Sequence, residues 1–345
     1  MQSTPKQQGN PVSVPSTPIP FGGNLAALLK RVGAKTETIV QPGRIEIRVG
    51  NPIAPIQPAQ PIDPADAPPH PSLQRCTEPS DYWEPDYADF LFHRWDVCRS
   101  VKGVREVGPR GTGKTQAAQV YAARRGKWFL PVNVHGNMTA DSLIGYSRLD
   151  LQGQGGDYFQ PGPLTIAAQY DAVLLLDEFN RATPDVQAIV NALTDGVNNG
   201  FFNPYTMRFM RWDNPRIILT MNEGYSGCRN MDQALLDRFA PVKCDYLPPE
   251  RESAIIIGRT GCSAPIVDTM VRCANSIRAA NKGDGGTIPL DFDLSPRPLI
   301  ECAERVVAGQ SVDRAWLESV IWRAGMDTML EPIIALSRSV GGYAV

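Results

Sequence analysis

The chain has 345 residues, 42% of them hydrophobic, and a formal net charge of −2 at pH 7. This length allows one large or two medium domains, and the near-neutral charge gives no general attraction to nucleic acid or anionic membrane. The seven cysteines form no Cys-x-x-Cys pair and the three histidines are scattered, which predicts reduced thiols and no zinc site. Because no signal-peptide pattern and no run of 18 apolar residues occurs, we expect a cytoplasmic protein without a membrane span.

Residues 1–80 form a segment whose composition differs from the rest. Prolines concentrate here, and residues 52–71 should be extended because proline fits neither helix interiors nor sheet ladders. A short helix is expected at 24–32 and a hairpin at 36–49, around the turn Gln41–Gly43. The hairpin could be a docking element or an accessory strand pair. The Pro-rich stretch could be a tether, a docking strip or a disordered segment.

The segment from Gly108 to Thr115 fits the phosphate-loop pattern Gly-x-x-x-x-Gly-Lys-Ser/Thr. Glycines let backbone N–H groups approach a triphosphate, and a helix that begins at the loop adds the positive end of its dipole. Lys114 would supply a charge for the β- and γ-phosphates, and Thr115 a hydroxyl for Mg²⁺. A strand-like stretch precedes the loop and a helix-like stretch follows it, which favours a nucleotide site over an ordinary glycine turn. The residues expected to contact the nucleotide are Gly108, Pro109, Arg110, Gly111, Thr112, Gly113, Lys114 and Thr115.

An acidic pair follows later in the chain, where four apolar residues lead into Asp177 and Glu178. This pattern is typical of a buried parallel strand whose acids project at the carboxyl edge of the sheet, where ligands bind in open α/β folds. Asp177 would hold Mg²⁺ through water, and Glu178 would orient and activate the attacking water. Alone, the pair could be a strand that ends in a polar turn. After a phosphate loop it indicates the catalytic side of a nucleotide site.

The remaining pattern predicts alternating strands and helices up to residue 247 and helices alone after it. Residues 81–100 are aromatic-rich and should pack beside the nucleotide site, with a helix in their second half. Further strands are expected at 127–135, 216–222 and 241–246, helices at 163–169, 182–198 and 231–239 with a short one that starts at Thr139, and hairpins at 147–159 and 200–213. Later helices are expected at 250–259, 265–281, 296–308 and from 312 onward. The predicted domains are thus the N-terminal segment 1–80, an α/β nucleotide-binding domain 81–247 and a helical domain 248–345.

Taken together, these motifs resemble AAA+ ATPases of the MoxR branch, which includes CbbQ, NorQ and gas-vesicle GvpN proteins. The resemblance covers about residues 82–310. Besides the two motifs above, it is carried by the segments 141–145, 161–164, 180–182, 186–187, 220–222, 234–239 and 295–297. It implies an α/β P-loop core with a parallel five-stranded sheet of order 5-1-4-3-2, helices on both faces, and a small all-helical lid.

The resemblance also implies three more site residues at matching positions. Asn222 would polarise the attacking water together with Glu178. Arg238 would be an arginine finger that reaches the γ-phosphate of a neighbouring subunit, and Arg297 a second sensor on the lid. From the residues alone, Asn222 could cap a strand end, and the two arginines could form surface salt bridges.

The two hairpins resemble the helix-2 insert and the pre-sensor hairpin of this branch. In the second, Phe201, Phe202 and Tyr205 are candidates for substrate contacts, or they pack against their own hairpin. The chain also departs from the family, with a charged Arg110 in the loop, Arg105 and Glu106 in a strand that is usually apolar, and Phe179 after the acidic pair. None of these removes a group that hydrolysis needs.

The implied function is that of an ATP-hydrolysing ring, expected to be a hexamer, that uses Mg²⁺ and remodels or activates a protein client. In some relatives that client carries a von Willebrand factor A-type domain. Two alternatives stay open. One is a nucleic-acid motor or restriction-type GTPase of the same superfamily. The near-neutral charge argues mildly against the motor, and nothing in the sequence reports a base preference. The other is a ring held together by ATP with little turnover, against which the intact Glu178, Asn222 and Arg238 argue.

Overall fold

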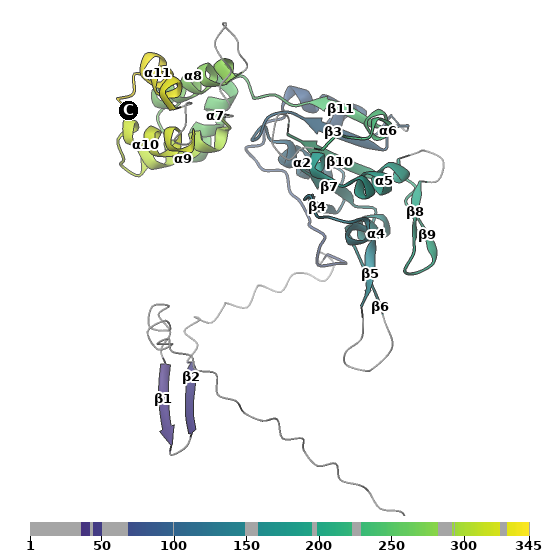
Figure 1. The fold of residues 1–345 in the computed structure, drawn as a ribbon. Coiled ribbons are helices and arrows are strands. Elements are labelled where there is room, and N and C mark those ends of the chain that lie inside the picture. Colours follow the sequence, from purple (N-terminus) through teal and green to yellow (C-terminus); the bar gives the residue numbers. More distant parts are fainter. Residues whose placement is uncertain are drawn as a thin grey trace, which may run out of the picture. The chain divides into compact units, whose positions relative to one another are not determined.

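The computed structural model describes part of the chain (Figure 1). The described residues are 36–41, 44–49, 68–98, 100–148, 158–194, 199–222, 229–281, 292, 294–324 and 330–344. Residues 1–67 and 68–345 form two separate units. In the first unit, β1 (Thr36–Gln41) pairs antiparallel with β2 (Arg44–Val49), where the sequence predicts a hairpin. The helix expected at 24–32 and the extended stretch up to residue 67 lie outside the described residues.

A parallel five-stranded sheet is the centre of the second unit (Figure 1). Its strands are β3 (Gly103–Val107), β4 (Phe129–Asn133), β7 (Val173–Asp177), β10 (Arg216–Met221) and β11 (Phe239–Lys243). They lie in the order β11-β3-β10-β7-β4, and each neighbouring pair is parallel. Numbered along the chain this order is 5-1-4-3-2, which confirms the predicted topology.

Each face of the sheet carries its own hydrophobic core because side chains alternate along every strand. On β7, Val173 and Leu175 pack toward α2 (Lys114–Arg124), whereas Leu174 and Leu176 pack on the opposite face. Helices α3 (Ala140–Ile144), α4 (Pro163–Gln169) and α5 (Pro184–Leu193) pack on this opposite face, together with Leu235. A fully buried leucine contributes about 2 kcal/mol, so this central strand is held firmly from both sides.

Two hairpins extend from the α/β region. In the first, β5 (Gly145–Arg148) pairs with β6 (Tyr158–Pro161), and in the second β8 (Gly200–Asn203) pairs with β9 (Arg208–Arg211). Both were expected from the sequence. The tip of the first hairpin and residues 195–198, which were expected to extend α5, lie outside the described residues.

The C-terminal helices enclose a separate core. They are α7 (Pro249–Thr260), α8 (Ala264–Asn281), α9 (Pro296–Val307), α10 (Val312–Ser319) and α11 (Leu330–Gly341). The single helical stretch expected from 312 onward was wrong, because a 3₁₀ turn at Ile321–Ala324 follows α10 before α11 begins. Among the helices that are described, none is long and apolar enough to cross a membrane. The cysteines in the described part of the chain are free thiols.

Candidate functional site

The phosphate loop joins β3 to α2. Its glycines are needed because of close packing at one position and positive φ angles at others. A Cβ added to Gly108 would lie 1.9 Å from the carbonyl oxygen of Cys244, just beyond β11. Gly111 and Gly113 have φ angles of 76° and 90°, in the region that favours glycine. Gly113 immediately precedes α2, so the loop feeds directly into a helix N-terminus, as the motif predicts.

Lys114 lies folded against the loop. Its Nζ donates hydrogen bonds to the carbonyl oxygens of Gly108 at 2.9 Å and Pro109 at 2.6 Å. The loop is also held from outside, because the Tyr87 hydroxyl donates to the carbonyl oxygen of Thr112 at 2.8 Å. Tyr87 was not predicted as a site residue, although the aromatic-rich segment that carries it was expected beside the site.

Thr115 and Asp177 meet at the carboxyl edge of the sheet, although they are far apart in sequence. The Thr115 hydroxyl lies 3.4 Å from Oδ2 of Asp177. The Thr220 hydroxyl, on β10, donates to Oδ1 of Asp177 and accepts from the Glu178 amide at 3.1 Å. A hydroxyl and a carboxylate fit Mg²⁺, which takes oxygen ligands and keeps several waters beside substrate phosphates. Thr220 was not predicted to have this role.

Glu178 has an unusual backbone conformation for a residue that is not glycine, with φ 56° and ψ 39°. Such a conformation costs about 1–3 kcal/mol and is found mainly where surrounding contacts enforce it, often at functional sites. The Glu178 carboxylate forms an ion pair with Arg181 at 3.0 Å. Arg181 belongs to a segment that carried the family resemblance, but the sequence assigned it no role.

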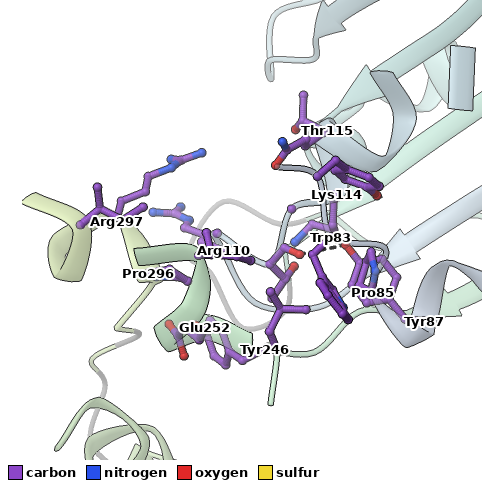
Figure 2. A pocket seen from close by; sticks show the side chains of 18 of the residues that line it. Trp83, Pro85, Tyr87, Arg110, Lys114, Thr115, Tyr246, Glu252, Pro296 and Arg297 are labelled. Carbon is purple, nitrogen blue, oxygen red and sulfur yellow. Dashed lines mark hydrogen bonds between the residues drawn. The ribbon is translucent and has the colours of Figure 1, made fainter. Parts of the chain in front are cut away.

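These groups face a cleft of about 820 Å³. Its wall includes the loop from Arg110 to Thr115, the two acids, Asn222 and Arg297. Figure 2 shows Arg297 on the lid side of this cleft and Lys114 and Thr115 on the side of the sheet. Most of the predicted site residues are therefore brought together. Gly108 and Pro109 do not line the cleft, and their carbonyls instead accept from Lys114.

Arg238 lies outside this cleft, at the end of α6 (Gln233–Arg238). Its Nη1 donates to the side-chain oxygen and, at 3.4 Å, to the backbone oxygen of Asn191 on α5. Among the described residues, these hydrogen bonds tie Arg238 to α5 and not to the phosphate loop. By contrast, Asn222 is held at the cleft, because the Asn180 side-chain amide donates to its carbonyl oxygen at 2.8 Å.

The structure separates the three aromatic candidates on the β8–β9 hairpin. Phe201 is 2% exposed and packs in the core, so of the two roles left open for it the structure shows packing and not a substrate contact. Phe202 is 50% exposed and Tyr205 is 38% exposed, and Tyr205 stacks on Phe159 of the other hairpin with ring centroids 6.1 Å apart. For Phe202 and Tyr205 both roles, substrate contact and packing, stay open.

Glu106, one of the departures from the family pattern, is completely buried on β3. Neither of its carboxyl oxygens has a hydrogen-bond partner among the described residues. Burial raises the pKa of this carboxyl to about 8, while the nearby Lys114 lowers it and Asp177 raises it further. The sequence flagged this residue as unusual, but its full burial depends on the packing of α2 and the aromatic segment.

Comparison with known proteins agrees with this geometry. Residues 107–239 match the family described as AAA domain (dynein-related subfamily), and residues 252–331 match the CbbQ/NirQ/NorQ C-terminal family. Protein CbbQ of Hydrogenophilus thermoluteolus is 31% identical over 59% of this chain and 73% of its own length. Protein NorQ of Paracoccus denitrificans is 29% identical over 60% and 74%, and the denitrification regulatory protein NirQ of Pseudomonas aeruginosa is 26% identical over 59% and 75%. The chain belongs to the MoxR-type AAA+ family, in the group that shares the CbbQ/NirQ/NorQ C-terminal region.

Proposed function

We propose that the protein is an ATP-hydrolysing ring that remodels or activates a protein client. The observation that carries this proposal is the meeting of Thr115, Asp177 and Glu178 at one edge of the cleft, opposite Arg297. A phosphate loop alone would support nucleotide binding. The added carboxylates and the asparagine at the same edge are the groups that hydrolysis needs.

In this mechanism the loop amides and the start of α2 bind the phosphates, and Lys114 leaves the carbonyls of Gly108 and Pro109 to contact the β- and γ-phosphates. Thr115 and Asp177 would hold Mg²⁺, which neutralises charge on the phosphate oxygens when it is bound. Glu178 orients the attacking water and accepts its proton, with Asn222 beside it. Because Arg181 pairs with Glu178, that ion pair must loosen before Glu178 can take this proton.

The ring is proposed because the site within one subunit lacks Arg238. A neighbouring subunit would bring its own Arg238 to the γ-phosphate, where its charge stabilises the transition state. Hexameric assembly and a client with a von Willebrand factor A-type domain are part of the same proposal. The relatives give it support: NirQ is by name a regulatory protein, as expected of a protein that acts on others.

The test is to replace Glu178 with glutamine. This variant should bind ATP with close to wild-type affinity, but its turnover should fall by at least about a hundredfold, because a water-activating group is lost. Lys114→Ala should weaken binding itself. The matched control is Glu304→Gln, which changes an exposed glutamate of α9 in the same way and should leave both properties unchanged.

Binding is measured by calorimetry and turnover by phosphate release, with ATP and GTP compared in parallel. Wild-type turnover in the Glu178→Gln protein would contradict the assignment of the catalytic residue. A wild-type chain that binds ATP and barely hydrolyses it would favour the ATP-held structural ring, and a strong preference for GTP would favour the restriction-type alternative.

A further inference from the structure

We infer that Arg278, a buried residue of α8 outside the cleft, positions the lid side of the nucleotide site. The inference deepens the proposed function and rests on it. Arg278 does not touch the cleft, and neither the sequence motifs nor the family comparison assigns it a role. Its contacts, however, reach three separate segments that form the wall of the cleft or lead into it.

The guanidinium of Arg278 is 6% exposed and almost fully used as a hydrogen-bond donor. It donates two parallel bonds to the Glu252 carboxylate at 2.7 and 2.8 Å, one to the Asn275 side chain at 2.9 Å and one to the carbonyl oxygen of Leu294 at 2.8 Å. It also lies over the ring of Tyr246, 3.9 Å from the centroid. The ammonium group of lysine cannot make all these contacts, because they need the several N–H donors and the flat shape of a guanidinium group.

Two of these partners belong to the wall of the cleft. Glu252, on α7, and Tyr246, which follows β11, both line it. Figure 2 shows the side chains of Glu252 and Tyr246 near each other at the lower rim of the cleft. Because Glu252 is 3% exposed and Arg278 is 6% exposed, removal of either partner would leave the other as an uncompensated buried charge. Arg278 thus fixes α7 and the segment after β11 against each other.

The third partner leads to the phosphate loop. Leu294 directly precedes Ser295, the N-cap of α9, and Pro296 and Arg297 are the first two residues of that helix. The loop packs against this start so closely that a Cβ added to Gly111 would lie 2.7 Å from the Cβ of Ser295 and 2.9 Å from Cδ of Pro296. By holding the carbonyl of Leu294, Arg278 sets where the lid meets the loop and where Arg297 enters the cleft.

Arg278 is therefore a positioning residue. It acts on bound nucleotide through Glu252, Tyr246 and the start of α9. A displacement of about 1 Å in such supporting contacts is enough to cost up to roughly a hundredfold in an enzyme's rate. An ordinary structural ion pair of the lid would change stability and leave nucleotide affinity alone.

The experiment replaces Arg278 with lysine in the full chain, in the Glu178→Gln background for binding and in the wild-type background for turnover. We expect the affinity for ATP to fall about tenfold, as a modest misplacement of binding groups predicts. The matched control is Arg305→Lys, on α9, because Arg305 also bridges two glutamates, Glu301 and Glu318, neither of which lines the cleft. Its ATP affinity should equal that of its parent.

A second readout is the increase in Tm that ATP causes in each variant, measured against that variant's own Tm without ATP, so that a less stable protein still reports on binding. If Arg278→Lys does not yield folded protein, Glu252→Gln replaces it, because glutamine keeps the shape of the side chain and removes the charge that Arg278 holds. Unchanged ATP affinity in either folded variant overturns the inference. Failure of the unmodified chain to bind ATP would instead overturn the proposed function.

Discussion

Glu106 is the residue whose surroundings conflict most with its chemistry. Its carboxyl is buried, lacks hydrogen-bond partners among the described residues, and has a pKa raised by burial to about 8 from a usual value of 4.5. The folded protein therefore keeps a proton on Glu106 at a pH where the unfolded chain has released it. Protonation of Glu106 therefore adds to the free energy of unfolding. This contribution is fully present below the pKa of Glu106 in the unfolded chain, and it is lost as the pH rises through the pKa of Glu106 in the folded protein.

This gives a pH-dependent prediction. Between about pH 5 and pH 8, wild-type stability should fall by up to about 1.4 kcal/mol per pH unit through this group, and Glu106→Gln should remove that part of the slope. Urea denaturation at several pH values measures it, with the exposed Glu304→Gln as the control. The interpretation is wrong if the difference in stability between the Glu106→Gln and wild-type proteins stays constant over this pH range.

The sequence could predict site residues whose type is restricted by the chemistry, but not those whose contacts depend on packing. The common position of Lys114, Thr115, Asp177 and Glu178 at one cleft could be predicted because phosphate and metal chemistry restricts residue type at fixed spacings. The role of Thr220 could not, because its hydroxyl bonds to Asp177 only once β10 lies beside β7. The contacts of Tyr87 with the loop and of Arg181 with Glu178 likewise depend on local backbone paths that no short motif specifies.

At the scale of elements, alternating hydrophobic patterns placed the strands and most helices, and the family resemblance supplied the sheet order. The break after α10 was missed for a tertiary reason. Trp316 on α10 stacks on Tyr343 with centroids 4.6 Å apart and donates to the Ser337 hydroxyl on α11 at 3.0 Å. These contacts require α11 to fold back against α10. A reversal set by such distant partners is not visible in the local periodicity.

The junction of β3, the loop and β11 yields a prediction of its own. In Gly108→Ala the added Cβ would collide with the carbonyl of Cys244, so the loop or the end of β11 must shift. We expect both a lower Tm and weaker ATP binding. Gly258→Ala is the control, because Gly258 lies within α7, a Cβ there meets nothing within 4 Å, and alanine favours a helix by up to about 1 kcal/mol. Equal ATP affinity for the Gly108→Ala and Gly258→Ala proteins would contradict this account of the loop.

For the whole molecule, the position of Arg238 outside its own cleft decides which assembly experiment is informative. If Arg238 acts on a neighbouring subunit, Arg238→Ala and Glu178→Gln proteins are each inactive, yet a mixture of them regains activity. In an equimolar mixture, an active interface needs an Arg238→Ala subunit, which supplies Glu178, next to a Glu178→Gln subunit, which supplies Arg238. If the subunits mix at random in a closed ring, about a quarter of the interfaces have this arrangement.

The measurement combines phosphate release from the mixed and separate variants with native mass, recorded with and without ATP and Mg²⁺. A rise in mass to about six subunits with ATP is expected for the ring proposed above, since symmetric closed assemblies are the common outcome of head-to-tail interfaces. Each variant mixed with wild-type protein serves as the control for subunit exchange. If the ring forms and exchanges subunits but the mixture stays as inactive as its components, Arg238 does not act across the interface, and its bonds to Asn191 are structural.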